Sequence, residues 1–354
     1  MKVCAVAAAR PNFMKLAPVV AALEAARVEV VLVHSGQHYD PMMSDVFFEE
    51  LALREPDHHL GVGSGTHAGQ TAGVMVAFEP LLDALDADVV MVVGDVNSTV
   101  ACALVAAKAG VAVAHVEAGL RSRDWSMPEE INRVVVDRIS DVLLAPSPDG
   151  VENLLAEGRP SESIHLVGNV MIDTLLTNLD RARARPVLGD LGLTEGGYGF
   201  VTMHRPANVD DPWVLRTVAE ALVRVARECP LVFPAHPRTA QKLDALDLGP
   251  DITVTGPVGY LDSLALQAGA RIVLTDSGGI QEETTVLGVP CLTLRDNTER
   301  PITIAEGTNQ LVGRDPERIV KAARAVLHDG VETRRPALWD GHASERIVAA
   351  LLGR

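Results

Sequence analysis

The feature that most constrains the fold is a repeated alternation of short apolar runs with longer stretches of helical period. In the first half of the chain, Val-rich runs are found at 2–8, 28–34, 88–93, 111–115 and 142–145. Stretches rich in Ala and Leu lie between them, at 14–26, 69–86, 98–109 and 130–140. Strands that are apolar throughout are buried on both faces, and strands that alternate with helices pair in parallel. The pattern therefore predicts a parallel sheet covered by helices on both faces.

The alternation stops once, at 185–199, where Pro and Gly predict a linker. A second set of runs follows near 199–203, 231–235, 252–255, 271–275 and 290–294. We therefore expect an α/β chain of two doubly wound, Rossmann-like domains, 1–185 and 198–342, with a cleft between them. A chain of 354 residues is long enough for two domains. One large sheet is the alternative, and a helix over 343–354 could pack on either domain.

Composition excludes several classes of partner. The formal net charge of −16 argues against a nucleic-acid or anionic membrane surface. The cysteines are far apart and lie in or beside apolar runs, which indicates buried thiols in a reducing compartment; they are Cys4, Cys102, Cys229 and Cys291. The apolar run before Arg10 is too short for a signal peptide, so we expect a cytoplasmic protein. No pattern of metal ligands occurs, and we expect no metal.

Carboxylates and arginines follow the strands of the first domain. HVEAGLRSRD at 115–124 places Glu117 directly after a predicted strand, and MPEEINR follows at 127–133. Ligands of an open α/β sheet bind at the carboxyl ends of its strands, so a carboxylate here suits catalysis. Neighbouring acids can also push their pKa values apart and supply an acid and a base in one site. Asp95 follows another strand, although GDVNST at 94–99 alone is equally typical of a helix N-cap.

A glycine turn marks the second domain. TDSGGIQEE at 275–283 places Ser277, Gly278 and Gly279 between a strand and a helix. Glycines let a ligand approach the backbone, and the free N–H groups of a helix start favour an anion. Glu283, in the first turn, could complement the helix dipole or accept hydrogen bonds from ribose hydroxyls. Ordinary turn geometry explains the glycines equally well, and the segment matches neither the dinucleotide fingerprint nor the P-loop.

Basic residues follow the first strand of each domain. His204 and Arg205 come after the strand near 199–203, and Arg10 ends the first strand of the chain. An isolated histidine is more often structural, but a His-Arg pair at a strand end is a reasonable phosphate contact. Arg300 follows the strand near 290–294, so we expect it at the cleft as well.

Taken in order, several motifs resemble one family. They are AARPNFMKLAP, GDVNST, HVEAGLRS, MPEEINR, VGNVMIDT, TMHRPAN and TDSGGIQEE followed by RDNTERP. Together they resemble the non-hydrolysing UDP-N-acetylglucosamine 2-epimerases over nearly the whole chain. The resemblance implies the two-domain GT-B fold, a UDP-sugar substrate, no cofactor and a homodimer. It also implies interconversion of UDP-GlcNAc and UDP-ManNAc by anti elimination of UDP, giving 2-acetamidoglucal, and re-addition on the other face of C2.

The resemblance assigns roles by position. Asp95, Glu117 and Glu129 match catalytic carboxylates, and His204 matches a histidine near the diphosphate. The expected substrate contacts are Arg10, Lys15, Arg121, Ser277, Gly278, Gly279, Glu283 and Arg300, with the diphosphate on the helix start and Glu283 on the ribose. Gln37 and His38 match a possible effector site for a second UDP-GlcNAc.

Departures from the family pattern leave room for a different substrate. Asn12 stands where many members carry glutamate, and Asp40 stands where members with an effector site often carry glutamine. A relative that acts on a modified sugar, such as a UDP-diacetamido uronic acid, is the main competing interpretation. Its extra carboxylate would need a cation, and Arg123 or Lys15 could supply one. A GT-B glycosyltransferase and a non-catalytic nucleotide-sugar sensor fit the motifs less well, and a hydrolysing epimerase is separated only by overall similarity.

Overall fold

The computed structural model describes residues 1–8, 10–36, 50–51 and 53–353. The chain forms two compact units, Met1–Thr177 with Ala337–Arg354, and Asn178–Pro336. The segment 185–199, expected as a linker, falls inside the second unit, where α8 (Val187–Asp190) forms. The C-terminal helix α16 (Ala343–Leu352) belongs to the first unit and contacts α1 (Arg10–Ala25).

The first unit is built on a parallel sheet. Its strands have the order β3-β2-β1-β4-β5-β6-β7 among the described residues. They are β1 (Lys2–Ala7), β2 (Glu29–His34), β3 (His58–His59), β4 (Val89–Val93), β5 (Ala112–Val116), β6 (Val142–Ala145) and β7 (Ile164–Leu166). The other helices are α3 (His67–Leu85), α4 (Asn97–Ala109), α5 (Pro128–Ile139), α6 (Pro148–Ala156) and the start of α7 (Val170–Arg183). All residues of β4 are buried, as a strand covered on both faces requires.

The second unit repeats the design. Its strand order is β10-β9-β8-β11-β12-β13 among the described residues, again with parallel pairs. The strands are β8 (Gly199–Thr202), β9 (Leu231–Pro234), β10 (Ile252–Thr255), β11 (Ile272–Thr275), β12 (Cys291–Thr293) and β13 (Asn309–Leu311). The helices beyond α8 are α9 (Pro206–Val209), α10 (Pro212–Ala226), α11 (Pro237–Leu243), α12 (Tyr260–Ala268), α13 (Gly278–Leu287), α14 (Ile302–Ala305) and α15 (Pro316–Asp329).

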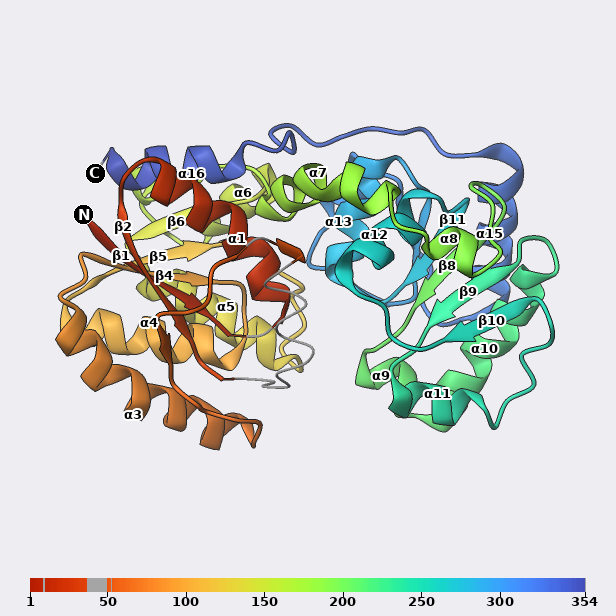
Figure 1. Ribbon diagram of the computed structural model, residues 1–354, viewed down its shortest axis with the longest axis horizontal. Helices are drawn as coiled ribbons and strands as arrows, with labels where there is room; N and C mark the ends of the chain where they lie inside the picture. The colour runs from red at the N-terminus through yellow and green to blue at the C-terminus, as the bar shows by residue number, and fades with distance from the viewer. Residues whose placement is uncertain (9, 37–49, 52, 354) are drawn as a thin grey trace. The chain divides into compact units, whose positions relative to one another are not determined.

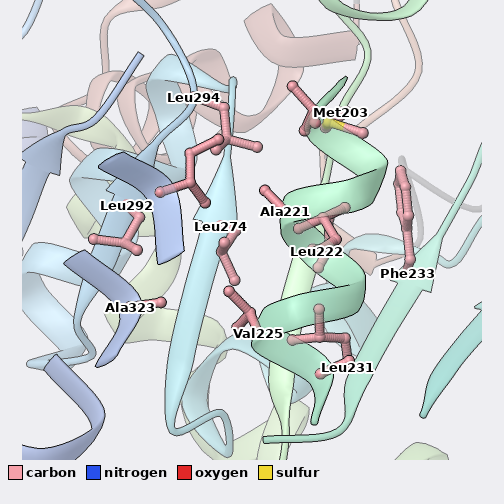
Figure 2. Close-up of a cluster of buried hydrophobic side chains, with 14 of the residues drawn as sticks. Met203, Ala221, Leu222, Val225, Leu231, Phe233, Leu274, Leu292, Leu294 and Ala323 are labelled. Atoms are coloured by element: carbon pink, nitrogen blue, oxygen red, sulfur yellow. The ribbon is translucent and has the colours of Figure 1, made fainter. Parts of the chain in front are cut away.

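Aliphatic side chains fill the core of the second unit. Figure 2 shows Leu222 and Val225 of α10 facing Leu274 of β11, with Phe233 of β9 beside them. These side chains are almost fully buried, and burying each contributes on the order of 1.5–3 kcal/mol. The packing fixes the strand ends from which the polar loops project.

Strand order reverses once in each unit. In the first unit the crossovers on the two sides of β1 and β4 run in opposite directions, and in the second unit the same occurs at β8 and β11. Ligands of doubly wound sheets bind at such switch points, beyond the carboxyl ends of the strands. No helix in the described part of the chain is long and apolar enough to cross a membrane.

Candidate active site

Two carboxylates lie at the switch point of the first unit. Asp95 follows β4 and Glu117 follows β5, and these strands are neighbours. Glu117 has a φ of 70°, a left-handed conformation that a non-glycine residue adopts at a cost. Its buried side chain forms an ion pair with Lys15 of α1. Asn12, on the same helix, donates from Nδ2 to the Val93 carbonyl at 2.9 Å, which fixes α1 against β4.

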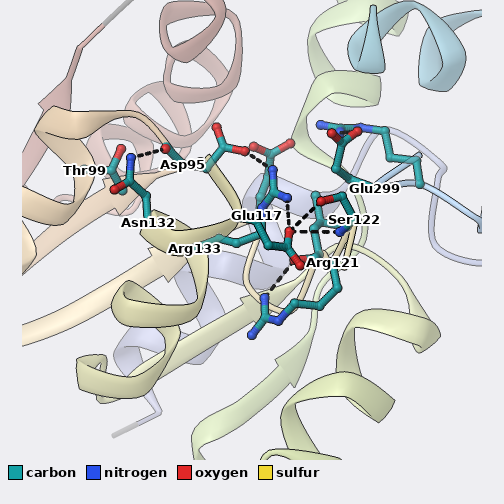
Figure 3. A network of polar contacts seen from close by, with 12 residues as sticks. Asp95, Thr99, Glu117, Arg121, Ser122, Asn132, Arg133 and Glu299 are labelled. Carbon is teal, nitrogen blue, oxygen red and sulfur yellow. Dashed lines mark hydrogen bonds and ion pairs between the residues drawn. The ribbon is translucent and has the colours of Figure 1, made fainter. Parts of the chain in front are cut away.

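Helix α5 supplies the cation for the second carboxylate. Arg133 forms ion pairs with both Asp95 and Glu130 (Figure 3). Asn132 donates from Nδ2 to the Asp95 carbonyl at 2.8 Å. Arg133 is buried, and a buried charge needs a partner. The two carboxylates compensate its charge. The helix therefore holds both the backbone and the side chain of Asp95.

The two glutamates that begin α5 differ in their surroundings. Glu130 is buried and accepts hydrogen bonds from the backbone N–H groups of Ser122 and Arg123, at 2.9 and 2.8 Å. Burial alone would raise the pKa of Glu130, but these hydrogen bonds and Arg133 hold it below its usual value. The Glu129 side chain is half-buried and makes no hydrogen bond or ion pair with any residue that the structure describes. Glu130 thus holds the loop, whereas the Glu129 side chain has no such structural bond there.

Arg121 is held by two carboxylates. Its guanidinium donates to both oxygens of Glu157, at 2.8 and 2.7 Å, and lies 2.7 Å from Oδ2 of Asp137. A further bond goes to the Leu120 carbonyl. These buried contacts hold the loop after β5, and the contact of Arg121 with substrate stays a prediction. The sequence gives no sign of these buried contacts, because Glu157 lies 36 residues away.

The second unit places His204 on a buried carboxylate. Asp276 follows β11 and is fully buried, and its Oδ1 lies 3.0 Å from His204 Nδ1. Asp276 also accepts from the backbone N–H groups of His204 and Arg205 and from Asn208 Nδ2. Burial alone would raise the pKa of Asp276, but these donors hold it below its usual value. The His204 ring itself is 62% exposed, so its outer nitrogen is open to solvent.

The start of α13 brings together the remaining predicted contacts. Ser277 is the N-cap, and Gly278 and Gly279 begin the helix. Arg300 lies against Gly278, where an added Cβ would be 2.7 Å from Arg300 Nη1. Its Nε lies 2.7 Å from Oε1 of Glu282. The glycine therefore makes room for a guanidinium at a helix N-terminus, a combination suited to an anion.

Glu283 lies deeper in the same helix. Its Oε2 accepts from Gln267 Nε2 at 2.8 Å, and burial raises its pKa to about 7. Burial raises the pKa of the Tyr260 hydroxyl, and the neighbouring Glu283 raises it further. Three predicted residues cannot be placed: Gln37 and His38, and the Arg10 side chain at the start of α1, lie outside the described residues.

The fold and the two groups of side chains define a class before any comparison is made. Two doubly wound parallel sheets, each with polar side chains at its switch point, are the architecture of GT-B-like α/β proteins. The sequence matches the model of the UDP-N-acetylglucosamine 2-epimerase family over residues 21–352. The chain therefore belongs to the UDP-N-acetylglucosamine 2-epimerase family.

Individual relatives cover the whole chain. It is 41% identical to the UDP-N-acetylglucosamine 2-epimerase of Methanocaldococcus jannaschii, over 99% of each protein. It is 39% identical, over the same share, to the UDP-2,3-diacetamido-2,3-dideoxy-D-glucuronate 2-epimerase of Pseudomonas aeruginosa. The crystal structure of the M. jannaschii enzyme in complex with UDP-GlcNAc and UDP matches with a TM-score of 0.92 and full coverage of both chains. A Neisseria meningitidis UDP-GlcNAc 2-epimerase bound to UDP-GlcNAc matches with a TM-score of 0.92 at 28% identity.

Proposed function

We propose that this protein interconverts UDP-GlcNAc and UDP-ManNAc by inverting C2 of the UDP-linked sugar. One observation carries the proposal: Asp95 and Glu117, on neighbouring strands, are each paired with a cation from a different helix. Inversion removes a proton from one face of C2 and returns a proton to the other. Two acid–base groups on a rigid frame suit this better than one.

The leaving group makes the proton transfer feasible. The C2–H is not acidic, so its removal is coupled to departure of the anomeric UDP, whose growing charge must be stabilised. We assign that task to the second unit, through His204, Arg300 and the N–H groups at the start of α13. UDP then adds back to the 2-acetamidoglucal while C2 is protonated on its other face. No group is oxidised, and no water is consumed.

We assign the acid–base roles to Asp95, Glu117 and Glu129. The first two follow adjacent strands, and Glu129 begins the helix whose Arg133 holds Asp95. Asp95 and Glu117 could act on opposite faces of the sugar, with Glu129 as a further proton donor. His204 serves the diphosphate, because Asp276 anchors Nδ1 and leaves Nε2 outward.

Two cations bear on whether the substrate carries a sugar carboxylate. A uronic acid would need a cation, and Lys15 and Arg123 are the two that the sequence suggests. Lys15 is paired with Glu117, and Arg123 donates from Nη2 to Asn153 at 2.7 Å. The P. aeruginosa relative keeps the diacetamido uronic acid as a second candidate substrate. A direct comparison of the two UDP-sugars by initial rates decides between them.

The test is proton NMR of the purified protein with UDP-GlcNAc in D2O. We expect UDP-ManNAc to appear with deuterium at C2, with both epimers UDP-linked at equilibrium. Release of free ManNAc with UDP would identify the hydrolysing reaction instead. Absence of any turnover of UDP-GlcNAc, with turnover of the diacetamido uronic acid, would transfer the function to that substrate.

Oxygen exchange separates elimination from oxidation at a neighbouring carbon. UDP-GlcNAc labelled with ¹⁸O in the anomeric bridge should show the label moving to non-bridging diphosphate positions. Only cleavage and re-formation of the C1–O bond can move it. Epimerisation with the label wholly retained in the bridge would contradict the elimination route.

A further inference from the structure

A fully buried histidine connects the two carboxylate loops. His115, on β5, is 0% exposed, and both ring nitrogens have partners. Nδ1 lies 2.6 Å from Oδ1 of Asp137 on α5, and Nε2 lies 2.9 Å from the carbonyl oxygen of Gly94. Gly94 immediately precedes Asp95, and His115 stands two residues before Glu117 on the same strand. The ring therefore contacts the ends of both strands that carry these carboxylates.

The partners determine the protonation of the ring. The other oxygen of Asp137 accepts from the Gly119 backbone N–H at 3.0 Å and lies 2.7 Å from Arg121 Nη1. Arg121 and the Gly119 N–H can only donate, and both face Oδ2 of Asp137, which suits a carboxylate. A carboxylate and a backbone carbonyl can only accept, so each His115 nitrogen faces an acceptor.

With a proton on each ring nitrogen, the charges around the ring balance. His115 of β5 and Arg121 of the loop after it are then two cations, matched by Asp137 of α5 and Glu157 of the turn after α6. Asp95 follows the Gly94 carbonyl after β4, and its own cation is Arg133 of α5. Without the imidazolium, Asp137 keeps its ion pair with Arg121 and loses its second cation. Loss of the ring proton would therefore change the charge near Asp137 as well as the hydrogen bonds that hold the two loops.

We propose that His115 is an imidazolium and that the His115–Asp137 ion pair positions Asp95 and Glu117. The ring fixes the Gly94 carbonyl, and Asp137 fixes the Gly119 N–H, so one ion pair holds the backbone next to each carboxylate. Asp137 lies on the helix that also carries Arg133. The pair thereby holds both loops in register with α5. Its kinetic consequences rest on the proposed epimerase function, but its ionic state does not.

Two substitutions separate the two bonds of the ring. His115→Gln keeps a donor near the position of Nε2 for Gly94, and His115→Asn keeps one near Nδ1 for Asp137. Asp137→Asn removes the anion. The matched control is Asp141→Asn, since Asp141 accepts from the Val113 N–H at 2.9 Å and so supports the other end of β5. Melting curves establish which variants are folded, and UDP titration counts their binding sites.

We expect folded His115→Gln and His115→Asn to lose about 10–100-fold in kcat on UDP-GlcNAc, because displacement by about 1 Å costs rates of this order. KM and the number of UDP sites per protein should stay near those of the parent. A loss of folded protein would instead lower the number of sites. The acid limb of the kcat–pH profile should move to higher pH, since protonation of a carboxylate becomes easier near an uncompensated anion. Asp141→Asn should change neither.

The ionic state is tested without turnover. In the ¹⁵N-histidine-labelled parent, both nitrogens of His115 should carry the chemical shifts of an imidazolium, with the signal assigned by its loss in His115→Asn. A neutral-ring spectrum would overturn the proposal, and so would folded His115 variants with kcat within threefold of the parent and an unmoved pH profile. A parent that does not epimerise UDP-GlcNAc would overturn the proposed function, leaving the spectrum to judge the ion pair.

Discussion

At the scale of single residues, Asp95 and Glu117 carry the chemistry that we propose. Glu117→Gln and Asp95→Asn keep nearly the same volume and remove the ability to take a proton. We expect each to lower kcat on UDP-GlcNAc by about 10²–10⁴-fold with the fold intact. Steady-state rates beside melting curves check this. Asp88→Asn, at the opposite end of β4, is the control and should keep parental rates. A folded Glu117→Gln with parental rates would remove that residue from the mechanism.

Glu283 gives a pH dependence of stability with a definite sign. Burial raises its pKa in the folded state from 4.5 to about 7. Between these values the folded protein binds the proton more tightly than the unfolded chain, so the contribution of Glu283 to stability is full below pH 4.5. It is lost as the pH rises through 7, at a cost of roughly 3 kcal/mol. Above pH 7 the carboxylate is buried without its proton.

Glu283→Gln removes that titration. Relative to the variant, the ligand-free parent should lose stability between pH 5 and pH 8, by up to roughly 3 kcal/mol. Urea unfolding of both proteins at the two pH values measures the difference, and other titrating groups cancel in it. A difference between parent and variant that is the same at both pH values would contradict the assignment.

At the scale of elements, the loop after β5 depends on a close approach to α6. Gly119 has a φ of 85°, and a Cβ there would overlap the carbonyl of Gly150. Gly119→Ala should therefore destabilise the protein by more than the roughly 1 kcal/mol of its backbone conformation alone. Gly158→Ala is the matched control, since Gly158 has a φ of 78° and open space around it. Equal losses in urea unfolding would show that the loop moves aside.

The strands buried on both faces could be predicted from the sequence, and most of the short edge strands in the described part of the chain could not. Continuous Val-rich runs predicted β4 and β5 because those strands are covered on both sides. Two edge strands lack such runs: β3 is only His58–His59, and β13 is Asn309–Leu311. Their position at the edge of a sheet comes from pairing with a neighbour, which no local pattern specifies. The fold class is confirmed.

The candidate site was predictable only in part, because local patterns do not specify contacts between distant residues. Carboxylates next to apolar runs were visible, but the partners that hold them were not. Helix α5 has a buried polar stripe whose residues are spaced by three and four positions, namely Glu130, Arg133 and Asp137. The helical period of the sequence could have suggested this stripe. Asp276 was visible only as the residue after a strand. The roles of Asp95, Glu117, Glu129 and His204 stay predictions until the variants are measured.

At the scale of the whole molecule, the first unit is completed by the end of the chain. Trp339 is buried and donates from Nε1 to the Pro146 carbonyl at 3.0 Å, and α16 packs on α1. Deletion of residues 337–354 should therefore reduce amide protection in β1, β4 and β5 and leave β8, β9 and β11 protected. Hydrogen exchange followed by mass spectrometry measures both units at once. Deletion of 353–354 alone is the control, and uniform loss across both units would contradict the division.

The return of the chain into the first unit also sets an order of events during synthesis. The second unit is, in effect, an insertion within the first, entered after Thr177 and left before Ala337. All of the second unit emerges from the ribosome before the last helix of the first. A nascent chain that has emerged from the ribosome as far as Pro336 can thus hold a complete second unit while the first unit still lacks α16. The part of the protein that begins folding earliest is finished last, and chaperones that recognise exposed apolar surface would meet it in that state.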